Sequence, residues 1–236
     1  MEHDKDSPLM ANKAKYLSLV MSLMYLARFT RPDILMPNSY LATRCSSPTE
    51  EDWEKLMRIV YYLAGTQDEG LTFSSKIPFK PILSVDASHH LYSEGHGQQA
   101  MVISNGSAPV GFRSTKIKMI TRSSSESELC ALEDSSTYAI WYALLLSDLN
   151  VDFTRPIPIQ QDNKSTIIMA IQGGTFKRTK HLIGRQNYVR ERIQAGDIAL
   201  TYTPTTEMVA DMLTKPVTRQ VLQRLKKKLF IGPVIN

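Results

Sequence analysis

Cysteine and long apolar runs are both scarce in this chain of 236 residues. Cys45 and Cys130 are too few for a disulfide scaffold or a cysteine-rich zinc site. The longest apolar-rich stretch, residues 17–27, is far shorter than the ~20 residues that cross a bilayer, so we expect no membrane partner. It follows an acidic start and lacks a clean cleavage site, which favours a buried helix over a signal peptide. We therefore expect an intracellular protein, in the cytoplasm or nucleus, with secretion as the less favoured alternative.

Familiar catalytic signatures are missing as well. There is no glycine-rich phosphate loop, and no G-x-S-x-G motif that would indicate a serine hydrolase. His89, His90, Glu94 and His96 fall in an expected loop without the spacing of zinc ligands. We therefore expect no dedicated zinc site.

The residues that are present have the composition of a folded protein with uneven charge. Hydrophobic residues make up 42% and charged residues 22%, which excludes a disordered or collagen-like chain. Residues 1–75 carry 8 basic and 10 acidic side chains, whereas residues 76–236 carry 20 and 13. A polyanionic partner, if there is one, should bind the second part, although composition alone favours ordinary solvated charges.

The first 75 residues have a helical pattern. Residues 14–29 are rich in Leu, Met and Ala, and residues 33–42 can form a second helix after the interruption at Pro32. A third helix is expected to start near Thr49, where a proline and acids suit a helix N-terminus. Its apolar stripe ends at Gly65, and these helices should serve packing.

From residue 76 onward, strands and helices alternate. Asn105-Gly106 between two expected strands predicts a hairpin, and Pro158 indicates a sheet edge or a strand start. The expected strands are 81–86, 99–104, 108–114, 157–161 and 198–203, and the expected helices run from Ser125 through the 140s and over 165–172, 180–194, 207–213 and 218–230. This order predicts the α/β class, with a mixed five-stranded sheet flanked by helices and preceded by a small helical segment.

Four acids stand at or near the ends of expected elements, namely Asp86, Glu128, Asp162 and Asp211. They are distant in sequence, so only folding can bring them together. Clustered carboxylates repel one another, and such a cluster makes sense around magnesium, which prefers oxygen ligands. Two such ions can activate a water and stabilise the leaving oxygen of a phosphodiester.

Each acid also has a purely structural explanation. Asp86 could form a turn after its strand, and Glu128 fits a capping box that begins at Ser125. Asp162 could cap the helix that follows it, and Asp211 could interact with a helix dipole. Taken singly, each acid favours the structural explanation, and spacing and composition alone do not identify a nuclease.

Several motifs, in order along residues 16–230, resemble one family. Tyr16–Ala27, Thr30–Ile34 and Tyr61–Thr66 are similar to the end of a copia-type retrotransposon reverse transcriptase, and Ser84–Ser88, Ser123–Leu129, Gln161–Asn163, Arg178–His181 and Ala210–Lys215 are similar to the ribonuclease H domain that follows it. The chain thus resembles the C-terminal part of a copia-type Pol polyprotein. Residues 1–75 would be a thumb- or connection-like segment and residues 76–236 a ribonuclease H-like domain. The polymerase fingers and palm are absent, so no DNA synthesis is expected.

The resemblance implies endonucleolytic hydrolysis of the RNA strand of RNA–DNA hybrids, by an enzyme that uses Mg²⁺, with Mn²⁺ as the alternative ion. By motif position, it assigns the catalytic, metal-binding residues: Asp86, Glu128, Asp162 and Asp211. Glu126 competes for the helix position, and we choose Glu128 because the apolar Leu129 follows it. The remainder of a reverse transcriptase is a further implied partner, and the oligomeric state stays open.

Basic residues supply candidate substrate contacts, namely Lys177, Arg178, Lys180, His181 and Arg185, followed by Arg190 and Arg192. A second run, of Arg113, Lys116, Lys118 and Arg122, contains no acid. Such groups neutralise phosphates without reading sequence, and a hybrid would be recognised by its shape and 2′-hydroxyls. A solvated basic helix face is the alternative, and we favour it for Lys226–Lys228.

The resemblance includes departures that bear on activity. Residues 88–96 read SHHLYSEGH, where the better-known copia pattern has an acid and a tryptophan. The alternative function is a catalytically decayed or repurposed ribonuclease H-fold protein, which acts as a nucleic-acid-binding or interaction module, in one version a secreted one.

Overall fold

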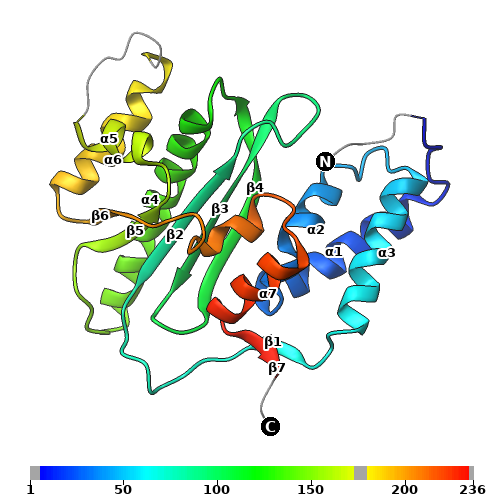
Figure 1. Cartoon of the computed structure of the whole chain (residues 1–236), viewed down its shortest axis with the longest axis horizontal. Coiled ribbons are helices and arrows are strands. Elements are labelled where there is room, and N and C mark those ends of the chain that lie inside the picture. Colours follow the sequence, from blue (N-terminus) through cyan, green and yellow to red (C-terminus); the bar gives the residue numbers. More distant parts are fainter. Residues whose placement is uncertain (1–5, 173–179, 234–236) are drawn as a thin grey trace.

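The structure is a computed structural model that describes residues 6–172 and 180–233 (Figure 1). The candidate contacts Lys177 and Arg178 lie outside the described residues. No helix in the described ranges is long and apolar enough to span a membrane.

The predicted helices of the N-terminal segment are confirmed. They are α1 (Lys13–Phe29), the short 3-10 helix η1 (Pro32–Ile34), α2 (Leu35–Ala42) and α3 (Glu50–Ala64). Asn12 caps α1 by accepting from the Lys15 backbone N–H at 2.9 Å. Thr49 and Asp52 form a reciprocal capping box at the start of α3, which satisfies N–H groups that the helix leaves without partners.

The predicted mixed five-stranded sheet is also confirmed. Its strands are β2 (Ile82–Ser88), β3 (His96–Ser104), β4 (Pro109–Ile120), β5 (Ile157–Gln161) and β6 (Ile198–Tyr202), in the order β4-β3-β2-β5-β6. The pairs β2/β3 and β3/β4 are antiparallel, whereas β2/β5 and β5/β6 are parallel. The β3–β4 hairpin needs Gly106, since its φ is +94° and a Cβ there would lie 2.6 Å from the Pro78 carbonyl oxygen.

Pro158 lies at the start of an interior strand, so the alternative of a sheet edge is wrong. It is the second residue of β5, which lies between β2 and β6. Pairing with β2 begins only one residue later, at Ile159 opposite Leu83. The missing N–H of Pro158 therefore falls where β2 does not yet pair.

Helices and loops cover both faces of the sheet. The helices α4 (Ser124–Asp148), α5 (Lys164–Gln172) and α6 (Ile183–Gln194) gather beside the β2–β5–β6 side in Figure 1, and α4 packs on β2 and β3. The short helix η3 (Val209–Leu213) packs on β2 and β3 too, and α2 on β4. Because side chains alternate along a strand, β3 places Met101 and Ile103 in the core with α4, and Ala100 and Val102 in the core with α1–α3.

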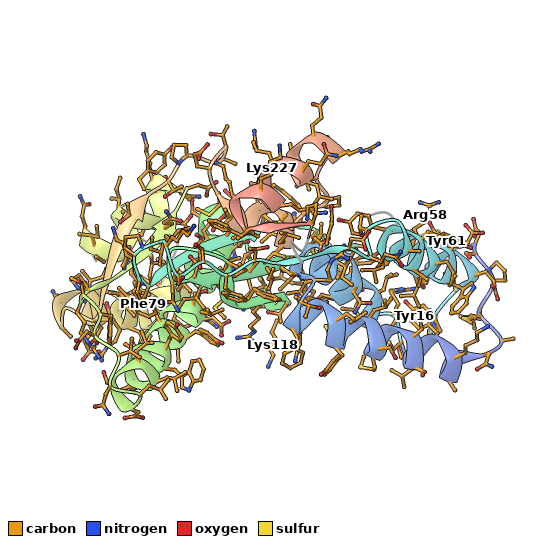
Figure 2. All side chains as sticks on the ribbon, turned by 90° about the horizontal axis from the view of Figure 1, so that it is seen from below. Tyr16, Arg58, Tyr61, Phe79, Lys118 and Lys227 are labelled. Atoms are coloured by element: carbon orange, nitrogen blue, oxygen red, sulfur yellow. The ribbon has the colours of Figure 1, made fainter. Side chains whose placement is uncertain are left out.

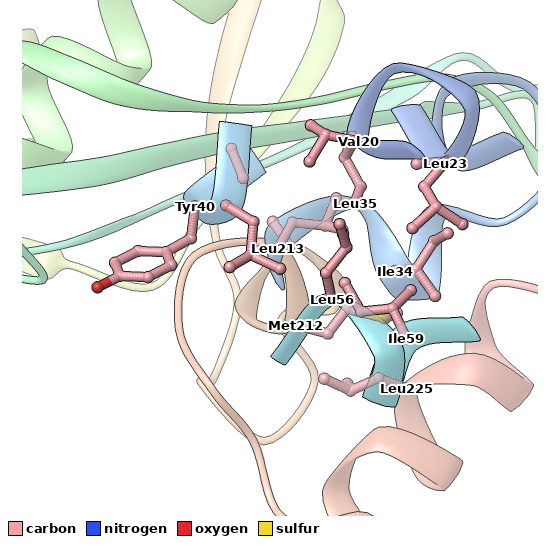
Figure 3. Close-up of a cluster of buried hydrophobic side chains, with 14 of the residues drawn as sticks. Val20, Leu23, Ile34, Leu35, Tyr40, Leu56, Ile59, Met212, Leu213 and Leu225 are labelled. Carbon is pink, nitrogen blue, oxygen red and sulfur yellow. The ribbon is translucent and has the colours of Figure 1, made fainter. Parts of the chain in front are cut away.

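The core that contains α1–α3 also holds residues from the C-terminal end of the chain. Figure 3 shows Val20, Ile34 and Leu56 of the N-terminal helices in one cluster with Leu213, and Leu225 of α7 (Arg219–Lys228) contributes to the same cluster. A two-stranded antiparallel sheet, β1 (Glu69–Leu71) with β7 (Ile231–Pro233), reinforces this junction. The sequence does not predict this small sheet, because its strands have only three residues each. The domain division at residue 75 stays a prediction.

Several boundaries differ from the sequence prediction. Strand β2 continues two residues beyond Asp86, so that acid lies inside the strand and not at a turn. The helix expected over 180–194 divides into the 3-10 turn η2 (Lys180–Leu182) and α6. The element expected over 207–213 is the 3-10 helix η3, and not an α-helix.

Candidate metal centre

Three of the four predicted acids meet at one place. Asp86 comes from β2, Glu128 from the start of α4, and Asp162 directly follows β5; one carboxylate oxygen from each lies within 4.8 Å of the others. The sheet topology explains this, because β2 and β5 are parallel neighbours and their C-terminal ends reach the same edge. Helix α4 packs on β2 and brings Glu128 to that edge.

Asp86 is held deep in the structure, with 2% of its surface exposed. The hydroxyl of Thr214 donates to its Oδ2 atom. Burial, and then the negative charge of Asp211, raise the pKa of Asp86 to about 7, while Thr214 and Lys215 act in the opposite direction. The site therefore makes ionisation of this carboxyl costly unless a positive charge is supplied.

Glu128 is similarly buried, with 4% exposed. Gln161 Nε2 donates to its Oε2 atom at 3.2 Å, and the Ala87 backbone N–H also donates to this carboxylate. Burial, followed by the charges of Asp86 and Asp162, raises its pKa well above the ordinary value. Both buried acids thus carry an electrostatic cost that a cation would relieve.

Asp211 lies beside this group and not within it. It sits in η3, and its charge acts on Asp86. Its Oδ1 atom lies 2.6 Å from the ammonium nitrogen of Lys215. The structure thus unites Asp86, Glu128 and Asp162, and places Asp211 at their margin.

The start of α4 distinguishes Glu128 from its competitor Glu126. Ser123 is the N-cap and accepts from the Glu126 backbone N–H at 3.3 Å, and the Glu126 carboxylate accepts from the Arg122 N–H at 2.7 Å. Glu126 therefore serves the helix start, whereas the predicted capping box from Ser125 to Glu128 is wrong. Glu128 is left to face Asp86.

The alternative of Asp162 as a helix cap is also wrong. Asn163 caps α5, because its Oδ1 atom accepts from the Thr166 backbone N–H at 3.1 Å. Asp162 instead accepts from Thr205 Oγ1 at 2.7 Å, and one of its carboxylate oxygens lies within 4.8 Å of those of Asp86 and Glu128. Asp211 does lie in the first turn of η3, but its nearest charge is Lys215 and not a helix end.

The donor set fits a hard divalent cation. It consists of three carboxylates, two of them buried, and oxygen ligands of this kind suit Mg²⁺ or Mn²⁺. Two of the three histidines of residues 88–96 make hydrogen bonds away from the acids: His89 Nδ1 lies 3.1 Å from Thr121 Oγ1, and His96 Nδ1 lies 2.8 Å from the Ile117 carbonyl oxygen. Among the described residues, no second group of three metal-ligating side chains occurs.

Many of the predicted phosphate contacts have acidic partners in the fold. Arg185 pairs with Glu133, and Arg113 with Asp134 at 2.9 Å. Lys180 is exposed, and His181 Nε2 lies 3.6 Å from Glu126 Oε2, which places η2 beside the start of α4. The fold brings in acids from other elements, so a basic run in the sequence did not predict free cations.

The lysines of the second basic run and of α7 differ in how far they are buried. Lys118 on β4 and Lys227 on α7 lie at the surface (Figure 2). Lys226 is buried, with its Nζ atom 2.9 Å from Tyr62 Oη and paired with Glu69. The prediction that Lys226 is solvated is therefore wrong.

The sequence analysis missed three polar side chains of the centre. Thr214 and Gln161 each donate to one of the buried acids, and Lys215 pairs with Asp211. All three lie within the quoted motifs Gln161–Asn163 and Ala210–Lys215. Their place within one to four positions of a candidate acid was the available signal.

Sequence comparisons find relatives in transposons. No family model matches the chain. It is 30% identical over 95% of its length to the retrovirus-related Pol polyprotein from transposon RE1 of Arabidopsis thaliana. It is also 33% identical, over 53% of its length and 89% of the relative's, to secreted RxLR effector protein 161 of Plasmopara viticola.

Among solved structures, the chain is similar to LC11-RNase H1, isolated from compost, with a TM-score of 0.44 and 16% identity over 61% of this chain and 96% of that one. The chain spans about 15% of the length of the Arabidopsis Pol polyproteins that it matches. The chain is thus related, over nearly all of its length, to copia-type retrotransposon Pol polyproteins.

Proposed function

We propose that this chain is a retrotransposon-derived ribonuclease H that hydrolyses the RNA strand of RNA–DNA hybrids endonucleolytically. The observation that carries the proposal is the convergence of Asp86, Glu128 and Asp162 within 4.8 Å from three distant parts of the chain. Its similarity to a transposon Pol polyprotein over 95% of its length supports the same reaction class.

The acids have distinct duties in this proposal. Asp86, Glu128 and Asp162 would hold Mg²⁺, or Mn²⁺ in its place, and Asp211 would complete the centre from its margin. The bound metal would supply a polarised water and neutralise charge on the scissile phosphate. Thr214 and Gln161 are positioning residues, since each fixes one buried carboxylate by a hydrogen bond.

The hybrid would approach along the edge where η2 meets α4. Lys180 is exposed there, and His181 lies close to Glu126 at the helix start. Lys180 supplies a positive charge at this edge, and Arg185, which pairs with Glu133 in the free protein, would exchange that partner for a phosphate. Such contacts would bind the phosphate backbone and leave recognition of the hybrid to its shape.

A cleavage assay tests the proposal. Wild type, Asp86→Asn and the control Asp148→Asn receive an RNA–DNA hybrid with Mg²⁺. Asp148 is an exposed acid at the far end of the helix that carries Glu128, so its loss leaves the centre intact. We expect wild type and Asp148→Asn to cut the RNA strand and Asp86→Asn to lose at least about a hundredfold in rate, as a lost ligand predicts. Equal cutting by wild type and Asp86→Asn, or cutting by neither, would contradict the enzymatic proposal.

A non-catalytic role is the second candidate. The similarity to an effector protein of Plasmopara viticola over about half of this chain favours it, because that relative is named for a role outside transposition. The chain would then act as a nucleic-acid-binding or interaction module. Binding of the hybrid without cleavage, at every Mg²⁺ and Mn²⁺ concentration tried, would select this candidate over the first.

A further inference from the structure

Lys215 introduces a positive charge into the acidic centre. It follows η3 by two positions, and its Nζ atom lies 2.6 Å from Asp211 Oδ1. Among the described residues, that oxygen is buried and has no hydrogen-bond donor besides this ammonium group. The pair therefore differs from the usual lysine–carboxylate contact of a solvated helix face.

The two partners differ in exposure. The Asp211 side chain is only 10% exposed, whereas the Lys215 side chain is 42% exposed. A contact with a buried carboxylate is weakly screened by salt, and this makes the ion pair stronger than a surface pair. The flexible lysine stem reaches solvent, so the ammonium can leave Asp211 without unfolding its surroundings.

The charge of Lys215 extends beyond Asp211. It acts on Asp86, which belongs to the group of three acids, and on Asp162. The ammonium thus lies on the Asp211 side of the four predicted acids, where their negative charges favour a cation. A divalent ion that approaches Asp211 meets a positive charge already in contact with its ligand.

We propose that Lys215 is a built-in monovalent cation that occupies the Asp211 side of the centre and competes there with a divalent ion. The inference rests on the proposed metal-dependent function and specifies how the chain regulates that site. Lys215 is a positioning residue in this role. It keeps the acids tolerable in the free protein and lets the second cation enter only when the ammonium turns toward solvent.

Calorimetric titration of Mg²⁺ into the full chain, without nucleic acid, tests the inference. The variants are Lys215→Gln, which removes the charge, and Lys215→Arg, which retains it. We expect Lys215→Gln to bind Mg²⁺ at least about fivefold more tightly than wild type, because removal of a unit charge a few ångströms away lowers the repulsion of a divalent ion. Lys215→Arg should bind as weakly as wild type. Thermal melting of each variant confirms that it is folded.

The outcomes separate this inference from the proposed function. Equal Mg²⁺ affinity of wild type and Lys215→Gln, with wild type still cutting the hybrid, would overturn the inference alone. Weaker Mg²⁺ binding by Lys215→Gln would also overturn it, since the lysine would then assist the metal. An absence of Mg²⁺ binding in wild type and both variants would overturn the inference together with the metal centre.

Discussion

Individual hydrogen bonds determine which acids cap a helix and which belong to the acidic centre. Ser123 with Glu126, and Asn163 with Thr166, satisfy the starts of two helices. This leaves Glu128 and Asp162 without a capping duty. A neighbour one or two positions away therefore determines whether a carboxylate serves the backbone or the centre.

Thr214 offers a test at this scale. We expect Thr214→Val to destabilise the protein by about 1–3 kcal/mol, since it leaves the buried Asp86 carboxyl without its hydroxyl donor. Thr214→Ser retains the hydroxyl and should lose much less. Urea unfolding at neutral pH measures both. If the valine and serine variants have the same free energy of unfolding, the hydrogen bond to Asp86 is not a stabilising contact.

The sequence could predict the identities of the acids but not their partners. Asp86, Glu128 and Asp162 were identified from motifs, and the sheet topology was sufficient to bring them together. The choice of Ser123 over Ser125 as the N-cap depends on where α4 leaves the preceding strand, which is a tertiary property. For the same reason the sequence did not predict that Lys215 pairs with Asp211.

At the scale of elements, strong local patterns were predictable and short ones were not. Strand β5 was expected with its observed bounds, Ile157–Gln161, because Ile157 and Ile159 alternate with less apolar residues. The three-residue strands β1 and β7 exist only through their mutual pairing. Helix α7 was expected within two residues at each end, yet its burial against the N-terminal helices was not, since its sequence is largely basic.

Leu225 tests the packing of α7. It is fully buried among α1–α3 and η3, and we expect Leu225→Ala to cost about 2–4 kcal/mol of stability through lost contacts and a residual cavity. The control is Leu144→Ala, where the side chain is 56% exposed on α4; it should cost less than about 0.5 kcal/mol. Chemical denaturation gives both values. Similar losses for the two variants would mean that α7 does not contribute to the folded core.

At the scale of the molecule, a buried polar network ties the first helices to the last. Arg31 donates to both carboxylate oxygens of Asp33 at 3.0 and 2.8 Å, and the Tyr62 hydroxyl donates to Asp33 Oδ2 at 2.6 Å. Lys226 of α7 approaches the same carboxylate at 3.8 Å. Charges separated by almost the whole sequence thus neutralise one another in the interior.

This network predicts a pH dependence of stability. Burial opposes ionisation of Asp33, but hydrogen bonds from Arg31 and Tyr62 outweigh it and lower its pKa. Because the folded pKa is lower than the unfolded one, the stabilisation is complete above the unfolded value of about 3.9 and is lost as the pH falls through the folded value.

Asp33→Asn removes this titration, so its free energy of unfolding should fall less steeply than that of wild type when the pH is lowered from 5 toward 3. Denaturation curves at a series of pH values measure the two slopes. Parallel slopes would exclude Asp33 as a source of acid sensitivity.

The alternation of side chains along β3 determines how a truncated fragment of this protein would behave. Ala100 and Val102 face the helices of the N-terminal segment, and Met101 and Ile103 face α4. One strand therefore contributes side chains to both hydrophobic cores. A fragment that begins after residue 75 would expose the face of β3 with Ala100 and Val102 to water and would tend to aggregate. Residue 75 therefore does not separate the two hydrophobic cores, because β3 contributes side chains to both of them.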